Sequence, residues 1–490
     1  MATLDDIADQ ALIPPSLTFG GARWSAEALA DRATAWHAHV TGTLDPDADA
    51  AAVVMESHPE SVALLFALSA LPLPVVLLHP EPSTWRSDPA FPRPMPVFLT
   101  PAAARFQSVL TAAGLPAAVL PEVARKPWRH QPRFLSTPGF VIFTSGSTGA
   151  PKPTFRSTRG LLQAARTITR TYSLPGGVRV AGCLPLATSF GLVQNIVLPA
   201  SLRGHVTLLE RFDHRSLLKL FADESFDFWP GTALMADLLV RAPLGDWSGR
   251  APAICNLSSG HLLEPIYWRF LDRFGVPLRQ SYGRSECSFI TSETAPVAEI
   301  RPETVGFPSP GVEIRCGDTP DHPVAAGVPG RIWIRCPWHS EGYGYPPRLK
   351  PIARPDGWCP SEDLGMLRAD GRLVILGRVD DCFKTSGGFL VSPALVVGAL
   401  RNHPDVVDAV VVPVPGRSGT AIGIVAVASG DVGRAEIHDL VRRVLPAWLR
   451  PAVVAMRAEI PTLSTGKHDR AACIRLLEGE RTAERGEAGS

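Results

Sequence analysis

The 490-residue sequence lacks the features that would direct it to nucleic acid, a metal cluster or a membrane. Its 48 basic and 47 acidic residues leave a formal net charge of +1, with no charged tail that would favour nucleic acid or an anionic surface. None of the eight cysteines forms a C-x-x-C pair, so a zinc site is not expected. The most apolar run, residues 61–79, contains Pro72 and Pro74. It predicts a buried helix followed by a strand at 75–78, and no membrane span.

The sequence also lacks an obvious secretory signal, and it is poor in lysine. Its first ten residues are acidic, and Pro14 and Pro15 interrupt the first apolar stretch, so a cytoplasmic location is the expected default. Only six lysines occur among the 48 basic residues, which makes the position of each lysine informative.

Short apolar runs alternate with amphipathic stretches over much of the chain. Residues 140–144, 180–184 and 206–209 are typical of strands, and residues 161–172 and 191–202 of helices. This alternation predicts an α/β fold with layers of mostly parallel sheets and helices.

The pattern changes twice toward the C-terminus. From about residue 304 to 370 it becomes β-rich, with Gly/Pro turns, and the last 110 or so residues show an α+β pattern of their own. We therefore expect a large N-terminal domain over residues 1–379, with a β-rich lobe near 304–370, and a small domain over residues 380–490.

A glycine-rich loop follows the apolar run at 140–144. It reads Thr144-Ser145-Gly146-Ser147-Thr148-Gly149-Ala150-Pro151-Lys152. The two glycines permit positive φ and close approach of a ligand, while four hydroxyls, backbone N–H groups and the lysine can bind phosphate oxygens. The alternative is a plain Ser/Gly turn, which seldom combines all these groups.

The loop is not of the Walker type. That motif needs lysine directly after its second glycine, and here Ala150 and Pro151 intervene, so a P-loop NTPase is disfavoured.

The loop resembles T-S-G-S-T-G-x-P-K, the most specific signature of the acyl-adenylate-forming superfamily of acyl- and aryl-CoA ligases, peptide-synthetase adenylation domains and luciferases. The resemblance continues in order to Arg470 and is loose over the first 130 residues. It implies that ATP and Mg²⁺ are needed, that coenzyme A is a probable co-substrate, and that the small domain moves. It also implies a catalytic role for Thr144.

Two further segments continue the resemblance. Residues 280–286 resemble Y-G-x-T-E, which implies that Glu286 is the Mg²⁺ ligand, since a hard cation needs carboxylate oxygen. Tyr282 would stack near the adenine, with Gly283 and Ser285 beside the nucleotide. Ser259 and Gly260 lie where the family has a small-residue turn against the adenine and the acyl pocket.

Residues 357–365 resemble D-G-W-x-x-T-G-D-L-G, which implies that Asp363 binds the ribose hydroxyls. The chain departs from this pattern at Ser361-Glu362, which replaces Thr-Gly. An acidic residue in place of glycine changes the local turn and bears on nucleotide affinity.

Residues 377–384 resemble the joint G-R-x-D-D-x-I-K between the two domains. Arg378 could reach the ribose, and Asp380 is the expected hinge. The thiol channel implied by the resemblance comprises Lys384, Ser386, Gly387 and Gly388. The family's later P-x-E reads Pro-Ala-Leu at 393–395, without the glutamate.

Residues 461–470 resemble the C-terminal P-x-x-x-x-G-K-x-x-R. The resemblance implies that Lys467 contacts the substrate carboxylate and the α-phosphate and stabilises charge in the transition state.

The segment 185–192 aligns with the family's acid pocket. Thr188 stands where many CoA ligases have a histidine, and no aspartate occurs at 189–190 to hold an α-ammonium group. An aryl or other non-amino acid is therefore favoured. The expected pocket residues are Thr188, Ser189, Phe190, Trp229, Gly231, Thr232, Ser259, Gly260 and Ser281; for the aromatic ones the alternative is core packing.

These patterns predict an ATP-dependent carboxylic-acid ligase that forms an acyl-AMP and transfers the acyl group to a thiol, most often coenzyme A. The alternatives are loading of a separate acyl-carrier protein, use of the adenylate for amide formation or another nucleophile, and a non-catalytic nucleotide-binding relative.

Overall fold

The structure is a computed structural model. It describes residues 12–81, 91, 95–122, 133–144, 151–243, 249–260, 262–401, 403, 405–416, 419–430, 432–443, 445–446, 449–462 and 468–487, with side chains as far as residue 481.

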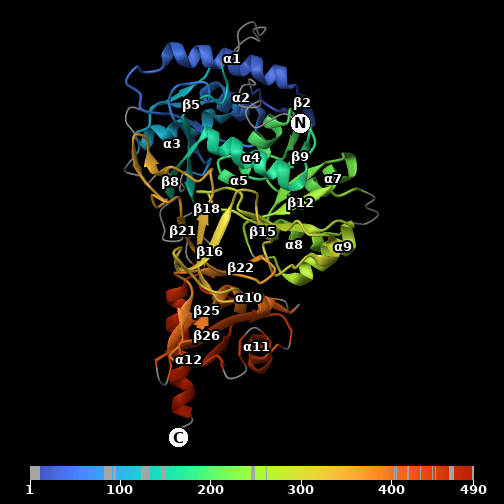
Figure 1. The fold of residues 1–490 in the computed structure, drawn as a ribbon, viewed down its shortest axis with the longest axis vertical. Helices are drawn as coiled ribbons and strands as arrows, with labels where there is room; N and C mark the ends of the chain where they lie inside the picture. The colour runs from blue at the N-terminus through green and yellow to red at the C-terminus, as the bar shows by residue number, and fades with distance from the viewer. Residues whose placement is uncertain are drawn as a thin grey trace.

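Two largely parallel sheets form the upper part of the molecule (Figure 1). One is a nine-stranded sheet in the order β15-β14-β13-β12-β11-β9-β10-β1-β2. Its strands are β1 (Ser16–Phe19), β2 (Ala22–Trp24), β9 (Arg179–Gly182), β10 (His205–Leu208), β11 (Phe228–Gly231), β12 (Ile254–Leu257), β13 (Leu278–Tyr282), β14 (Thr291–Ser292) and β15 (Phe307–Pro308). The six strands from β13 to β1 run parallel.

The second sheet has eight strands in the order β20-β19-β8-β7-β4-β3-β5-β6. They are β3 (Ala51–Val54), β4 (Val75–Leu78), β5 (Val97–Leu99), β6 (Ala117–Val119), β7 (Gly139–Thr144), β8 (Lys152–Ser157), β19 (Gly342–Tyr345) and β20 (Arg348–Lys350). The central strands β3 and β4 are apolar throughout and fully buried, as expected of parallel strands covered on both faces.

Helices cover the two sheets. They are α1 (Ala26–Thr43), α2 (Pro59–Leu68), α3 (Gln107–Ala112), α4 (Thr158–Tyr172), α5 (Ser189–Gly191), α6 (Leu198–Ser201), α7 (His214–Asp223), α8 (Ala233–Arg241) and α9 (Glu264–Phe274). Ser157 caps α4 by accepting from the Gly160 N–H, and the helix ends at Ser173 in the left-handed region. The buried face of α4 joins one hydrophobic core with strands of both sheets.

Below these sheets lies a five-stranded antiparallel sheet in the order β17-β16-β18-β21-β22 (Figure 1). Its strands are β16 (Glu313–Thr319), β17 (His322–Pro323), β18 (Gly330–Arg335), β21 (Cys359–Leu367) and β22 (Leu373–Arg378).

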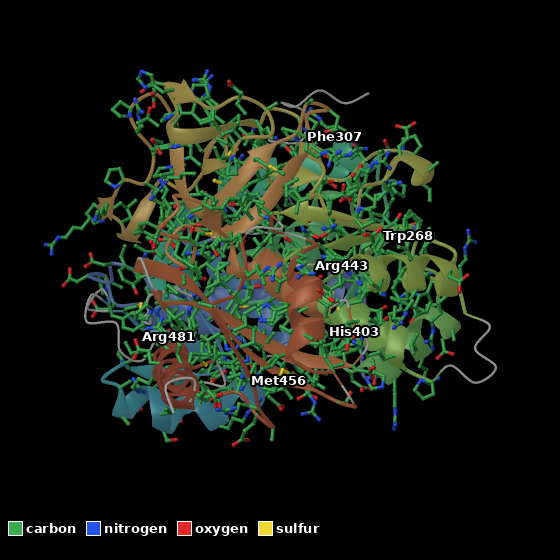
Figure 2. All side chains as sticks on the ribbon, turned by 90° about the horizontal axis from the view of Figure 1, so that it is seen from below. Trp268, Phe307, His403, Arg443, Met456 and Arg481 are labelled. Carbon is green, nitrogen blue, oxygen red and sulfur yellow. The ribbon has the colours of Figure 1, made fainter. Side chains whose placement is uncertain are left out.

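The C-terminal part is smaller and lies at the lower end of the molecule (Figure 1). Figure 2 views it from this end, with His403, Arg443, Met456 and Arg481 labelled on it. It contains the pair β23 (Phe383–Lys384) and β24 (Leu390–Val391), the three-stranded sheet β25 (Val406–Gly416), β26 (Gly419–Ala428) and β27 (Val453–Met456), and the helices α10 (Pro393–Arg401), α11 (Arg434–Val441) and α12 (Arg470–Glu487).

The predicted fold class is confirmed: a large parallel-sheet α/β part carries a smaller α+β part. Residues 61–79 form the end of α2 and the strand β4, as predicted. No helix in the described ranges is both long and apolar enough to cross a membrane. The predicted domain boundary at residues 379 and 380 stays a prediction.

Candidate functional site

The candidate site lies where the three sheets of the large part meet. Lys152 begins β8 of the eight-stranded sheet, Tyr282 ends β13 of the nine-stranded sheet, and Asp363 and Arg378 are cross-strand partners on β21 and β22. In open α/β sheets, ligands bind outside the carboxyl ends of the strands, which is where Tyr282 lies. The chain thus brings together four of the sequence-predicted residues from segments far apart in sequence.

An ion pair and a hydrogen bond connect three of these residues, and Lys152 pairs with Glu362 next to Asp363. Arg378 Nη1 lies 3.3 Å from Asp363 Oδ1, and the Tyr282 hydroxyl donates to Asp363 Oδ2 at 2.5 Å. Burial, and then the negative charge of Asp363, raise the pKa of Tyr282, so this hydroxyl stays protonated and acts as a donor. The Asp363 side chain is only 11% exposed and is therefore held in a fixed position.

The turn after β13 carries the buried carboxylate Glu286. Its Oε1 accepts from the Tyr343 hydroxyl at 2.5 Å and from Arg284 Nη2 at 3.2 Å. Arg284 also donates to the Pro360 carbonyl at 3.0 Å, which links the turn to β21. Gly283 is required for the tightness of this turn, because a Cβ there would lie 2.0 Å from the Ser288 carbonyl oxygen.

The Glu286 carboxylate fits a magnesium site. Its Oε2 receives no hydrogen bond from the part of the chain that the structure describes. Mg²⁺ in nucleotide sites is held by one or two carboxylates, with water and phosphate oxygens completing its octahedron. Among the described residues, no group of three His, Cys, Asp or Glu side chains could hold a metal ion.

Arg156 of β8 lies beneath both the turn and the acid-pocket segment. Its Nη1 donates to the Ser285 carbonyl at 2.6 Å and to Ser288 Oγ at 2.8 Å, and its Nη2 donates to the Trp338 carbonyl at 3.0 Å. Arg156 is fully buried, and burial lowers its pKa. No carboxylate among the described residues forms an ion pair with it, and its Nε has no hydrogen-bond partner there.

The predicted acid-pocket residues follow the carboxyl ends of β9, β11, β12 and β13. Ser189 is buried, with its Oγ 3.0 Å from Ser288 Oγ, and Thr188 caps the short helix α5. Thr232 caps α8, while Ser281 donates to the Leu257 carbonyl at 3.1 Å. Phe190 is half-buried.

Trp229 lies in the core. It is fully buried, stacks on Phe270 at 6.2 Å between ring centroids, and donates from Nε1 to Cys183 Sγ at 3.3 Å. Its ring lies under Gly231, where a Cβ would come within 2.5 Å of it. Trp229 therefore takes part in core packing, which is the alternative stated for it. Ser259 and Gly260, which follow β12, both have positive φ.

The hinge and thiol-channel residues follow Arg378 in the chain. Asp380 is exposed after β22, Lys384 is exposed at the end of β23, and Ser386, Gly387 and Gly388 are exposed on the turn between β23 and β24. Ser386 Oγ donates to the Thr420 carbonyl at 3.1 Å. Arg470 forms an ion pair of 2.7 Å with Asp381, next to the predicted hinge.

Several predicted residues lie outside the described ranges. They are Ser145, Gly146, Ser147, Thr148, Gly149 and Lys467. The ends of the glycine-rich loop are described: Thr144 and Lys152 are partners on β7 and β8, and Thr144 Oγ1 donates to the Lys152 carbonyl at 3.3 Å.

The sequence prediction missed four residues of the cluster. Arg284 lies within the Y-G-x-T-E-like segment, so its position was a usable signal, and Glu362 was noticed only as a departure from the family. Tyr343 and Arg156 belong to no recognised motif, and only the pairing of β8 with β19 brings them to the site.

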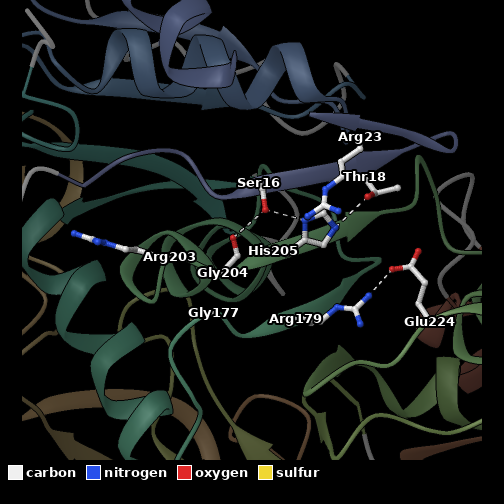
Figure 3. Close-up of a pocket in the computed structure, with 9 residues that line it drawn as sticks. All are labelled: Ser16, Thr18, Arg23, Gly177, Arg179, Arg203, Gly204, His205 and Glu224. Carbon is white, nitrogen blue, oxygen red and sulfur yellow. Dashed lines mark hydrogen bonds and ion pairs between the residues drawn. The ribbon is translucent and has the colours of Figure 1, made fainter. Parts of the chain in front are cut away.

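A polar cavity of about 510 Å³ lies at the amino ends of three strands of the nine-stranded sheet (Figure 3). Its residues are Ser16, Thr18, Arg23, Gly177, Arg179, Arg203, Gly204, His205 and Glu224. Ser16, Arg179 and His205 begin β1, β9 and β10, so the cavity lies at the amino ends of the strands and is separate from the candidate site.

Comparison with known proteins gives the family. The model of the AMP-binding enzyme family matches residues 14–344, and that of the AMP-binding enzyme C-terminal domain matches residues 398–467. A long-chain-fatty-acid–CoA ligase of Escherichia coli O157:H7 is 27% identical over 337 residues, which are 67% of this chain and 60% of that protein. A 3-hydroxybenzoate–CoA ligase of Aromatoleum sp. (strain CIB) is 29% identical over 70% of this chain and 67% of its own length.

Solved structures show the same fold over the whole chain. ATP-bound MatB from Rhodopseudomonas palustris has a TM-score of 0.78 at 22% identity and covers 96% of this chain and 97% of its own. The amide bond synthetase McbA from Marinactinospora thermotolerans also scores 0.78 at 22% identity, covering 96% and 98%. The first family match alone spans more than half of the 490 residues. The chain therefore belongs to the AMP-binding enzyme family, which is part of the acyl-adenylate-forming superfamily whose signature the glycine-rich loop resembles.

Proposed function

We propose that the chain is an ATP-dependent carboxylic-acid ligase that forms an acyl-AMP and transfers the acyl group to a thiol. The proposed thiol is that of coenzyme A. The observation that carries this proposal is the joining of Lys152, Glu286, Asp363 and Arg378 in one polar cluster. Each comes from a separate family-like segment, and the segments follow in the family's order.

In the first half-reaction, a carboxylate oxygen of the acid attacks the α-phosphorus of ATP, and the bond to pyrophosphate breaks. Lys152 and Arg378 would bind the anionic nucleotide, and Asp363 would accept from the ribose hydroxyls. Lys467 would stabilise charge that develops on the α-phosphate in the transition state. Glu286 would hold Mg²⁺, which neutralises the triphosphate when bound.

In the second half-reaction, the sulfur of a thiol attacks the acyl carbonyl carbon, the bond to AMP breaks, and the thiol proton passes to solvent. We expect this step to require rotation of the small domain about Asp380, which would bring Ser386, Gly387 and Gly388 to the site. The exposed position of these residues is consistent with such a rotation.

The acid is proposed to lack an α-ammonium group. Arg156 is a buried cation directly beneath Ser189, at 3.5 Å from its hydroxyl. A second positive charge in the pocket above it would be repelled at low dielectric. An aryl or acyl acid meets no such cost.

ATP–pyrophosphate exchange over a panel of aryl, fatty and amino acids, with and without coenzyme A, tests the proposal. We expect exchange with one class of non-amino acid and coenzyme A-dependent release of AMP. Lys152→Ala should lower the exchange, while Lys219→Ala, which removes an exposed lysine of α7, should not.

Each alternative has its own outcome in this assay. Exchange without coenzyme A-dependent AMP release would favour a carrier protein or an amine as acceptor. Absence of exchange with every acid would contradict the proposal and favour a non-catalytic nucleotide-binding protein.

A further inference from the structure

Glu362 is the one acidic residue that the cluster contains and the family pattern does not predict. It replaces the glycine of T-G-D and lies on β21, directly before Asp363. Its Oε1 lies 3.2 Å from Lys152 Nζ, and its Oε2 forms an ion pair with Arg378 Nη2. One carboxylate therefore bridges the lysine at the end of the glycine-rich loop and the arginine next to the predicted hinge.

Glu362 changes the charge balance of the site. The cluster contains four cations, Lys152, Arg156, Arg284 and Arg378, and the two family-like carboxylates Glu286 and Asp363. Without Glu362, these described side chains would carry two net positive charges to attract an anionic ligand. Glu362 removes one of them, so a nucleotide meets a less positive site.

Glu362 is charged at neutral pH. Burial pushes its pKa upward, but the hydrogen bond and charge of Lys152, followed by the charges of Arg378 and Arg284, outweigh burial and hold the pKa below its ordinary value.

The bridge is accessible to an incoming ligand. The side chains of Lys152, Glu362 and Arg378 are 40%, 35% and 32% exposed, whereas those of Arg284 and Glu286 are 9% and 8% exposed. Exposed ion pairs contribute little stability, so solvent or a stronger anion can replace them. A phosphate group offers more charge and more acceptor oxygens than one carboxylate.

Lys152 has a second support that does not depend on Glu362. Its Nζ lies over the Tyr343 ring, 5.7 Å from the centroid. A cation at that distance is attracted by the ring face. Lys152 would therefore keep its place at the site when the carboxylate leaves.

We propose that the Glu362 carboxylate is an internal anion that occupies Lys152 and Arg378 in the nucleotide-free chain and that the triphosphate of ATP must displace. This inference rests on the proposed function, because it takes the cluster to be the nucleotide site. Glu362 thus sets the affinity for nucleoside triphosphates: it weakens their binding in proportion to their negative charge, and it changes the binding of the uncharged nucleoside much less.

The test is equilibrium binding by calorimetry, at neutral pH and fixed ionic strength, with Mg·ATP and with adenosine as probes. The full chain is compared with Glu362→Gln, which keeps the shape and removes the charge, and with Glu362→Gly, which restores the family residue. Glu313→Gln is the matched control, because Glu313 forms an exposed ion pair of 2.6 Å with Arg335 in the same five-stranded sheet.

We expect Glu362→Gln to lower the dissociation constant for Mg·ATP roughly threefold to tenfold, the combined effect of releasing two exposed ion pairs. The dissociation constant for adenosine should change by much less, because adenosine has no phosphate to compete for Lys152. The Glu313→Gln chain should bind both probes like the unaltered chain. Binding of Mg·ATP by the Glu362→Gln chain alone would also support the inference.

Equal or weaker binding of Mg·ATP by both Glu362 variants would overturn the inference and leave the proposed function standing. An equal gain for Mg·ATP and adenosine would also overturn it, because the effect would then come from shape and not from charge. Failure of every chain to bind Mg·ATP would contradict the proposed function as well.

Discussion

Polar side chains gather at both ends of the parallel strands of the nine-stranded sheet, and the two ends are built differently. At the amino ends, the two ring nitrogens of His205 form hydrogen bonds with the hydroxyls of Ser16 and Thr18 on the neighbouring strand, at 2.8 and 3.0 Å. Arg179 pairs with Glu224 at 2.8 Å. These partners lie on or beside the strands themselves, so the cavity of Figure 3 is a local feature of one sheet.

At the carboxyl ends, the partners come from three sheets. Tyr282 of the nine-stranded sheet donates to Asp363 of the five-stranded sheet, and Lys152 of the eight-stranded sheet pairs with Glu362. The residues between these segments number in the tens to hundreds. The difference indicates that burial of polar groups alone does not identify a site, whereas convergence of distant segments with complementary charges does. Four substitutions test this contrast, from the largest expected effect to the smallest.

Lys467→Ala should have the largest effect. We expect it to lower the rate of ATP–pyrophosphate exchange roughly 10²- to 10³-fold, as loss of one positioned donor to a developing oxyanion does. The melting temperature should not change. Exchange at an undiminished rate would contradict the assignment of Lys467, and Lys219→Ala serves as the control for removal of a lysine.

Glu286→Gln should lower exchange roughly a hundredfold and raise the Mg²⁺ concentration needed for half-maximal rate, because a neutral amide is a poor ligand for a hard cation. It should also destabilise the chain by about 3 kcal/mol, since Arg284 would be left buried without its carboxylate. Titration of Mg²⁺ and thermal unfolding measure the two effects. An unchanged Mg²⁺ dependence would exclude Glu286 as the ligand.

Arg156→Met should lower exchange roughly ten- to a hundredfold, because the turn that carries Glu286 loses its donors and shifts. Arg156→Lys keeps the charge but not the planar fork, so it should restore only part of the activity. Steady-state exchange separates the three chains. Full activity of Arg156→Met, with intact folding, would show that the turn is held by Arg284 alone.

His205→Gln should have the smallest effect and none on exchange at pH 8. Burial, and then the charge of Arg23, lower the pKa of His205, with Glu224 acting in the opposite direction and Arg179 in the same one. As the pH falls through about 6.5, His205 therefore becomes protonated in the unfolded chain before it does so in the folded chain. The contribution of His205 to the unfolding free energy decreases from about pH 6.5 down to the folded pKa and is constant below it.

The Gln variant should lack this part of the pH dependence of the unfolding free energy, measured by denaturant titration at several pH values. A pH profile identical to that of the unaltered chain would contradict the assigned shift. A loss of exchange activity would contradict the claim that only the carboxyl-end cluster takes part in adenylation.

Much of the fold could be predicted because the residue pattern within a single segment determines whether that segment forms a strand or a helix. The apolar run at 140–144 lies in β7, and the residues with helical spacing at 161–172 form most of α4. The helix expected at 191–202 proved to be α5, a π-helical turn (Leu192–Val197) and α6, because Pro199 and the packing around Asn195 interrupt regular α-helical bonding.

The site was less accessible to sequence reasoning. The resemblance to the family's motifs predicted Lys152, Glu286, Asp363 and Arg378, because each of them lies within one short segment. It could not predict that Tyr343 and Arg156 join the candidate site, since they belong to no motif and lie on the paired strands β8 and β19. Nor could it predict that Glu362 pairs with two cations. The contact with Arg378 depends on the pairing of β21 with β22, and the contact with Lys152 on how the five-stranded sheet packs against the eight-stranded one.

The most direct test of the central claim is ATP–pyrophosphate exchange with the unaltered chain, Glu286→Gln and His205→Gln, over the same panel of acids. If the carboxyl-end cluster is the adenylation site, one non-amino acid will support exchange, Glu286→Gln will lose it, and His205→Gln will retain it. Exchange that survives in Glu286→Gln, or that is lost in His205→Gln, would contradict the account.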